Sequence, residues 1–215
     1  MPLDRAVRPR RGAAVTKRAI LTAAQLQFTA DSFDQVGVRE IAATAGVDPA
    51  LVIRYFGSKE RLFAEAVTGE FRPDDLIAGD RATFGERAAR GLLTKSKGAA
   101  GFDPMLALIR SAGSDEAAPL IRRELDANFV RPLADWLGGS LAAERAGLIT
   151  AMLAGLGLQR HVVGSASLID AALDDLVALA GPILQAWVDD TGPTVTDSVP
   201  HADRPYHPPT DDDIP

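Results

Sequence analysis

Apolar residues recur along most of this chain at the spacing of an α-helix, and this periodicity constrains the fold more than any other feature of the sequence. Near the N-terminus, Ile20, Ala24 and Phe28 recur every four residues, so they share one helical face. No segment alternates apolar and polar residues convincingly with period two, and no Asn-Gly or Asp-Gly pair marks a hairpin turn. The sequence therefore predicts an all-α fold.

The two ends of the chain lack this periodicity. Residues 1–12 hold four arginines and two prolines, and residues 191–215 hold six of the 14 prolines and end in Asp211-Asp212-Asp213. Such compositions bury too little apolar surface to offset the entropy lost on ordering. We expect a disordered basic arm at 1–12 and a disordered Pro/Asp-rich tail at 191–215, with a domain at 13–70 and a larger one at 71–190 between them.

Composition excludes several classes of protein. There is no cysteine, which rules out disulfides, cysteine-ligated zinc and thiol catalysis. The longest apolar stretch without a charge, residues 146–159, is 14 residues long, whereas a membrane span needs about 18 or more. The hydrolase, metalloprotease and nucleotide-binding motifs are absent. We expect a cytoplasmic protein with no membrane contact, no enzymatic activity, no metal and no cofactor.

The net charge of −6 conceals an uneven distribution. Residues 1–60 hold nine Lys and Arg against six Asp and Glu, whereas residues 61–215 hold 14 against 23. A basic end on an acidic chain is typical of proteins that bind nucleic acid, although a solvated tail has the same composition. If the protein binds DNA, the N-terminal part must make the contact.

Residues 38–56 (VREIAATAGVDPALVIRYF) predict two short helices joined by a tight turn. Gly46 lies where the chain must leave the first helix, a position that favours left-handed backbone. Asp48 is placed to cap the second helix, and Pro49 suits its first turn, where an N–H would have no partner. This is the layout of a helix-turn-helix, whose second helix enters the DNA major groove, although an ordinary helical hairpin shares these features.

The surrounding sequence favours DNA binding. Residues 16–67, with the runs V-R-x-I-A, A-G-V and Y-F-G-S-K-E-x-L-F, resemble the DNA-binding region of the TetR family of transcriptional regulators. The resemblance implies an N-terminal three-helix DNA-binding domain followed by a larger helical domain for ligand binding and dimerisation. It also implies a homodimer on a near-palindromic operator in double-stranded DNA, and in most members a repressor released by a small molecule.

Position by position, the resemblance implies a set of DNA-facing residues. They are Lys17, Arg18, Arg39, Asp48, Pro49, Ala50, Leu51, Ile53, Arg54, Tyr55 and Lys59. Arg39 is placed to contact a guanine or a phosphate, or to form a surface ion pair near Glu40, and Leu51 either faces DNA or lies in the core. Lys59 begins a helix, whose N-terminal amides favour anions.

Two departures from the family pattern affect this set. Gly37 stands where the family usually has Thr or Ser, so the first helix of the motif lacks a capping hydroxyl. Ile53 stands where the family commonly has a tyrosine that touches DNA. We therefore expect an apolar contact from Ile53, for example with a thymine methyl group.

A row of small residues marks the C-terminal part. Gly147, Ala151 and Gly155 recur every four residues and permit close approach of another helix. With the expected helix at 168–187, the family resemblance places this row in a four-helix dimer interface; the alternative is close packing inside one subunit. The interface candidates on the second helix are Leu176, Leu179 and Ile183.

The same part supplies candidates for a ligand pocket, although apolar residues at helical spacing suit a core equally well. They are Phe102, Met105, Leu106, Ile109, Phe129, Trp136, Met152 and Leu156. Arg160 and His161 end the apolar run of residues 146–159. They either contact an anionic ligand head or mark a solvent-exposed helix end, where cations suit the helix dipole.

Three functions remain open at this point. The first is a repressor released by a small, hydrophobic effector. The second is a DNA-binding regulator controlled by a protein partner, and the third is a helical lipid- or drug-binding protein that does not use DNA.

Overall fold

The computed structural model describes residues 8–70, 73–94 and 101–189, and these residues form helices with no strand. The prediction of an all-α fold is confirmed. The α-helices are α1 (Arg8–Ala30), α2 (Val38–Ala45), α3 (Pro49–Phe56), α4 (Lys59–Ala66), α5 (Asp74–Ile77), α6 (Phe84–Thr94), α7 (Pro104–Ser111), α8 (Ala117–Leu125), α9 (Arg131–Leu137), α10 (Ala142–Gly157), α11 (Ala166–Ile169) and α12 (Leu173–Val188). Two 3₁₀ turns, η1 (Thr68–Glu70) and η2 (Arg81–Thr83), and two π-helical turns, η4 (Asp126–Val130) and η5 (Leu158–Val163), accompany them.

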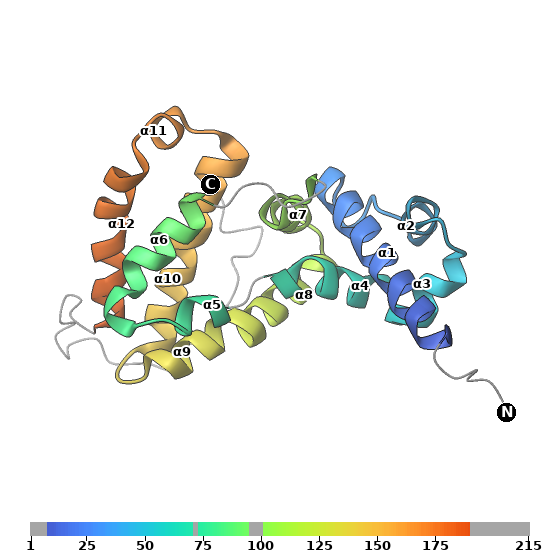
Figure 1. Ribbon diagram of the computed structural model, residues 1–215, viewed down its shortest axis with the longest axis horizontal. Coiled ribbons are helices and arrows are strands. Elements are labelled where there is room, and N and C mark those ends of the chain that lie inside the picture. The colour runs from blue at the N-terminus through green and yellow to red at the C-terminus, as the bar shows by residue number, and fades with distance from the viewer. Residues whose placement is uncertain (1–7, 71–72, 95–100, 190–215) are drawn as a thin grey trace, which may run out of the picture.

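The helices form two groups at opposite ends of an elongated molecule (Figure 1). We call α1–α4 the head, and α5, α6 and α9–α12 the body. Helices α7 and α8 lie between the two groups. The head therefore projects from the body, which leaves its outer surface accessible.

Aromatic rings fill the core of the head. Phe28, Phe33 and Phe63 are fully buried, and the ring of Phe63 meets the other two nearly at right angles, with centroid distances of 4.9 and 5.3 Å. Edge-to-face pairs of this kind add about 0.5–1.5 kcal/mol each beyond the area that they bury. Ile20 of α1 and Ile41 of α2 are also fully buried, so this core fixes α2 against α1.

Helices α7 and α8 contribute residues to the core of the head, although they follow the body helices α5 and α6 in sequence. Phe102, Ala107, Leu120 and Ile121 are buried in the same cluster as the head residues. The head core thus extends beyond the boundary at residue 70 that the sequence suggested, and residues 102–121 return to it.

The body has a separate core in which α6 and α12 cross closely. Phe84, Leu133, Ile149 and Leu184 are fully buried in it. At the crossing, a Cβ atom on Gly85 would lie 2.1 Å from the carbonyl oxygen of Gly181. A side chain there would force the two helices apart, so the crossing favours glycine.

Several boundaries differ from the sequence-based expectations. Helix α1 begins at Arg8, so residues 8–12 are helical rather than part of a disordered arm; Pro9 lies in the first turn, where its missing N–H would have no partner. A proline inside a helical pattern predicts a kink or a break. Near Pro132 the helical path passes through the π-helical turn η4, whereas α12 runs unbroken through Pro182. The helix expected at 168–187 is divided into α11 and α12. The remaining arm, residues 1–7, and the tail at 191–215 lie outside the described residues.

Candidate DNA-binding site

Two short helices and a three-residue turn form the motif predicted from the sequence. Gly46 has φ 67°, in the left-handed region, and the N–H of Val47 bonds to the carbonyl of Ala42 at 3.0 Å to close α2. The carboxylate of Asp48 accepts a hydrogen bond from the N–H of Ala50 at 2.8 Å, and Pro49 is the first residue of α3. The glycine, cap and proline of this turn therefore lie as the sequence predicted.

Without a hydroxyl at Gly37, the start of α2 uses another cap. The carboxylate of Glu40 accepts a hydrogen bond from the Gly37 N–H at 2.9 Å. This is one half of a capping box, and it satisfies a donor that would otherwise lack a partner.

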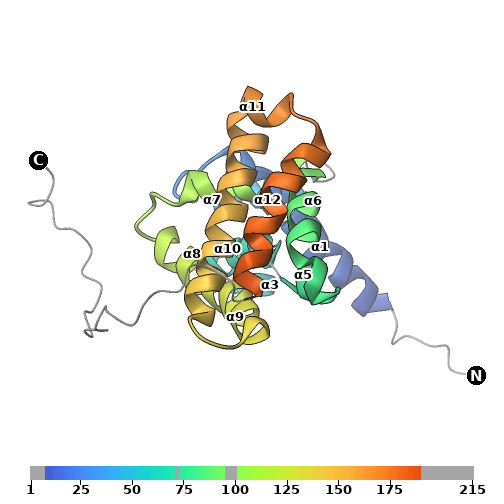
Figure 2. The same ribbon diagram turned by 90° about the vertical axis from the view of Figure 1, so that its left-hand side faces the viewer.

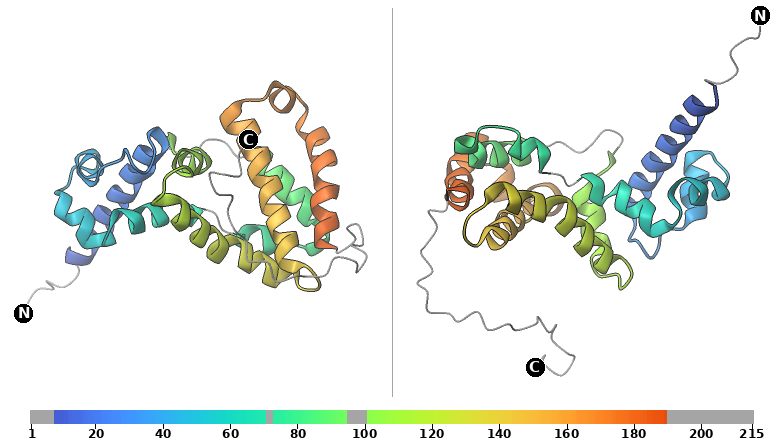
Figure 3. Two further views of the ribbon diagram at one scale, coloured as in Figure 1. Left: turned by 180° about the vertical axis from the view of Figure 1, so that it is seen from behind. Right: turned by 90° about the horizontal axis from the view of Figure 1, so that it is seen from below.

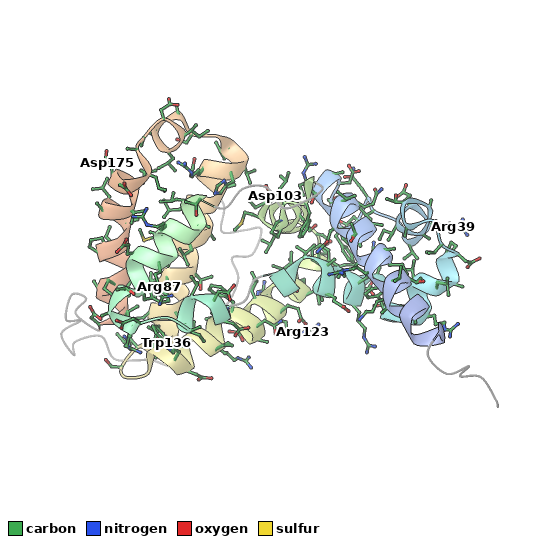
Figure 4. The ribbon with its side chains drawn as sticks, viewed as in Figure 1. Arg39, Arg87, Asp103, Arg123, Trp136 and Asp175 are labelled. Atoms are coloured by element: carbon green, nitrogen blue, oxygen red, sulfur yellow. The ribbon has the colours of Figure 1, made fainter. Side chains whose placement is uncertain are left out.

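The buried and exposed residues of the motif lie on opposite faces. Ile41, Val52 and Phe56 are buried in the core of the head, which fixes the angle between α2 and α3. The opposite face leaves Arg39, Pro49, Ala50, Ile53 and Arg54 exposed, and Ile53 is 46% exposed. Figure 4 shows Arg39 at the end of the head that is turned away from the body.

Three arginines supply positive charge that is available to a ligand. Arg18, Arg39 and Arg54 are exposed, and none forms an ion pair or hydrogen bond with its side chain to the described part of the chain. Phosphate contacts require cations of this kind. The N-terminal end of α1 extends beyond the rest of the head (Figure 3), and Arg18 lies near the middle of this helix.

The two lysines of the predicted set have partners within the protein. Lys17 forms an ion pair with Glu65 at 2.8 Å. The ammonium of Lys59 donates to the carbonyl of Phe33 at 3.0 Å and lies 4.0 Å from the centre of the Phe33 ring. The structure thus gives Lys59 an internal partner as well as its place at the start of α4.

The N-terminus of α4 also holds an anion of the protein itself. Ser58 caps this helix by accepting from the Arg61 N–H at 3.3 Å. A hydrogen bond with the Ser58 side chain, and next a hydrogen bond with its own backbone, lower the pKa of Glu60. Its carboxylate therefore stays ionised beside the amides at which a phosphate was expected.

Comparisons with known proteins agree with this geometry. The family described as "Bacterial regulatory proteins, tetR family" matches residues 20–66, and the one described as "Tetracyclin repressor-like, C-terminal domain" matches residues 82–188. A TetR-family regulator of Streptomyces coelicolor A3 is similar in structure, with a TM-score of 0.55 and 31% identity over 82% of this chain and 96% of that chain. This chain belongs to the TetR family of transcriptional regulators.

Two further structures share the TetR fold. A TetR-family regulator of Rhodococcus sp. has a TM-score of 0.60 at 19% identity, covering 81% of this chain and 99% of that chain. NalD of Pseudomonas aeruginosa, the secondary repressor of a multidrug efflux pump, has a TM-score of 0.54 at 19% identity, covering 77% and 94%. Identities this low support the fold alone. No curated protein matches the chain.

Family membership confirms the general predictions from the sequence. Proteins of the TetR family are DNA-binding transcription factors and not enzymes, with an N-terminal helix-turn-helix domain and a helical C-terminal domain. The helix-turn-helix is thus a DNA-binding unit, not an ordinary helical hairpin.

Two residues of the predicted DNA-facing set also pack on the core of the head. Leu51 and Tyr55 are half-buried against it, whereas Ile53 and Arg54 between them are exposed. This alternation follows from the helical period, which turns Val52 and Phe56 inward. The outward face of α3 therefore consists chiefly of Pro49, Ala50, Ile53 and Arg54.

The small-residue row of α10 is open within one TetR protomer. A Cβ atom on Gly147 or Gly155 would meet no atom within 4 Å, and Ala151 is exposed. Beside it on α12, Leu179 is 70% and Ile183 is 50% exposed, and Leu176 is half-buried. Helices α10 and α12 lie side by side on one face of the body (Figure 2). Within residues 8–70, 73–94 and 101–189, no neighbour therefore packs closely on Gly147 or Gly155.

The segment Ala142–Val163 comprises α10 and η5. By length and composition alone it is long and apolar enough to cross a membrane, and 22% of its apolar 18-residue window is buried. The sequence criterion missed this segment because it counted only the charge-free stretch at residues 146–159, which ends at flanking charges. One of these, Arg145, is buried and donates to the backbone carbonyl of Trp187 at 2.9 Å.

Five of the ten candidate ligand residues lie in or against the two cores. Phe102 is buried in the head core and Phe129 in the body core. Met105, Leu106 and Ile109 are half-buried on α7, and Met152 and Leu156 pack on the body core from α10. Trp136 stacks on Phe84 with a centroid distance of 5.2 Å.

Arg160 and His161 form hydrogen bonds to backbone carbonyls of other helices of the body. The guanidinium of Arg160 donates to the carbonyl of Leu93 at 3.1 Å and also to that of Leu168, and the His161 ring bonds to the carbonyl of Leu92 at 3.0 Å. They join the end of α6 to η5 and α11. Their half-burial and these bonds distinguish them from a fully solvated helix end.

Two open hollows lie on the described surface. One, of about 430 Å³, lies between α1 and α2, and the other, of about 540 Å³, lies between α6 and α12. None of the ten candidate ligand residues lines either hollow.

Proposed function

We propose that this protein is a repressor that binds a near-palindromic operator as a homodimer and leaves it when a small, hydrophobic effector binds. The outward face of the helix-turn-helix carries this proposal. Arg39, Ile53 and Arg54 are exposed on a motif that the core, Gly46 and Asp48 hold in place. Arg39 and Arg54 have no ion-pair partner among the described residues, so their charge is available to DNA.

The exposed face of the body supports the homodimer. Gly147, Ala151 and Gly155 leave room for a helix backbone, and Leu179 and Ile183 present apolar surface beside them. A twofold pairing through this face would bury it and carry two heads. The heads would then occupy half-sites about 34–36 Å apart, one helical turn of DNA or a little more.

The effector is proposed from the match of residues 82–188 to the tetracycline-repressor-like C-terminal domain. The candidate residues for its site remain Phe102, Met105, Leu106, Ile109, Phe129, Trp136, Met152, Leu156, Arg160 and His161.

Two experiments test the proposal. A gel-shift titration at one salt concentration compares the DNA upstream of the protein's own coding sequence with a shuffled duplex of equal length. A repressor of this kind binds the upstream DNA far more tightly; equal affinity for both duplexes contradicts the proposal. The fluorescence of Trp136 and Trp187 then reports effector binding, and DNA must weaken that binding by the factor by which the effector weakens DNA binding.

A further inference from the structure

Four hydrogen bonds join the α7 region to the end of α1 and the loop that follows it. The N–H of Asp103 donates to Thr29 Oγ1 at 3.1 Å, and Arg110 donates to the carbonyl of Ala30 at 2.6 Å. Further along the loop, Ser111 Oγ accepts from the Phe33 N–H at 3.1 Å, and Ser114 Oγ donates to Asp34 Oδ1 at 2.7 Å. We call these four bonds the latch.

The backbone of Phe33 is bonded both by the latch and by α4. Ser111, which is fully buried, accepts from the N–H of Phe33, and Lys59 donates to its carbonyl at 3.0 Å. The Phe33 ring is locked between Phe28 and Phe63 in the core. The backbone of one residue, Phe33, thus connects α7 to the first residue of α4.

The latched loop leads directly into α2. It spans residues 31–37, and Arg39 is the second residue of the helix that follows. The position of Arg39 over DNA therefore depends on where this loop is held. Ser114 holds the loop at Asp34 and also caps α8, because its Oγ accepts from the Ala117 N–H at 3.1 Å.

Helix α7 touches the body as well as the head. It packs against η5, and a Cβ atom on Gly157 of α10 would lie 3.7 Å from the terminal methyl group of Met105. One side of α7 therefore contacts the long helix of the exposed body face, and the other side holds the loop before α2.

We propose that Ser111 and Ser114 are positioning residues for operator recognition. Through their bonds to Phe33 and Asp34 they fix the position of the loop that precedes α2. They thereby link the position of Arg39 on α2 to helix α7. Neither residue is on the outward face of the head, and neither is among the residues that the sequence marked as DNA-facing. This proposal rests on the proposed function, because it needs a DNA-binding head.

The test is a set of variants measured for operator affinity and for thermal stability. Ser111→Ala and Ser114→Ala each remove a latch hydroxyl. Ser114→Thr keeps the hydroxyl, whereas Ser114→Asp keeps a good cap for α8 but loses the donor and places a carboxylate beside Asp34. Thr150→Ala is the matched control, because its hydroxyl bonds to Ala146 within α10 of the body.

The alanine variants and Ser114→Asp should bind upstream DNA about tenfold more weakly, the effect expected for one lost hydrogen bond to a charged or buried group. Ser114→Thr and Thr150→Ala should bind like the wild type. Combined with Arg39→Ala, Ser114→Asp should add little further loss, because both changes remove the same contact.

The proposal would be overturned if Ser114→Asp and Arg39→Ala reduced operator affinity additively. It would also be overturned if the operator affinity of the serine variants fell only in proportion to their unfolded fraction. Wild-type affinity of Ser114→Asp would overturn it as well. These outcomes leave the proposed function intact when the wild type prefers upstream DNA. A wild-type protein without that preference overturns the proposed function and this inference together.

Discussion

The head and the body bury their apolar residues to different extents. The head closes its core with Phe28, Phe33 and Phe63, and its exposed large apolar side chains, Val15 and Ile53, lie on α1 and α3. The body leaves Leu148, Leu179 and Ile183 exposed next to an open glycine row. The difference indicates that the head can present its surface to DNA as one protomer, whereas the body presents a face suited to another helix pair.

The two regions also differ in how they use glycine. In α10, Gly147 and Gly155 have open space around them, which suits an approach from outside the protomer. In α6 and α12, Gly85 and Gly181 are in close contact with each other's helix. The same residue type therefore marks an internal crossing in one place and an outward face in the other.

The largest expected effect comes from Gly155→Leu. A Cβ atom there would meet no described atom within 4 Å, and leucine favours a helix by up to about 1 kcal/mol over glycine. It should block pairing through α10, so the protein should become a folded monomer with helical circular dichroism. Operator preference over random DNA, typically about 10³-fold or more, should be lost.

Gly85→Ala is the matched control for that variant. Its Cβ atom would collide with the Gly181 carbonyl, and overpacking of this kind typically costs about 1–3 kcal/mol. We expect a lower melting temperature with dimerisation retained. Sedimentation and thermal melting of both variants separate the two uses of glycine; a dimeric, operator-binding Gly155→Leu protein would contradict the proposed interface.

Local features of the sequence were enough to predict the helix-turn-helix. Gly46, Asp48 and Pro49 act through bonds to residues at most four positions away, so the turn and the start of α3 follow from the sequence alone. The outward position of Arg39 and Arg54 follows from the helical period in the same way.

Contacts between distant residues could not be predicted in this way. Ser111 lies 78 residues from Phe33, and Lys59 lies 26 residues from it. Helical periodicity identifies a buried face but not its partner, so the return of α7 and α8 to the head had no local indicator. For the same reason the bonds of Arg160 to Leu93 and of His161 to Leu92 were not foreseen.

The next largest effect is expected from Arg39→Ala in the head. If its guanidinium contacts a base, the change should reduce operator affinity by about 1–3 kcal/mol and relax the preference at one base pair. Arg123→Ala in α8, where Arg123 pairs only with its neighbour Glu124, is the control and should bind normally. Binding to a panel of single-base operator variants shows whether Arg39 contacts a base. A uniform loss of affinity across the panel would indicate a phosphate contact instead.

The smallest effect distinguishes two cations within the head. Arg54 is exposed and should contact a phosphate, so Arg54→Ala should reduce the slope of log affinity against log salt concentration by about one. Lys59 is engaged with Phe33, so Lys59→Ala should change this slope less and lower the melting temperature more. Equal slopes for both variants would contradict this distinction.

Sedimentation of the wild-type protein, alone and with the duplex from its own upstream DNA, tests the central claim most directly. The account predicts a dimer of 22.7 kDa chains in both cases, with two protomers bound to each near-palindromic site. A monomer in free solution that binds the site as a single protomer would contradict it.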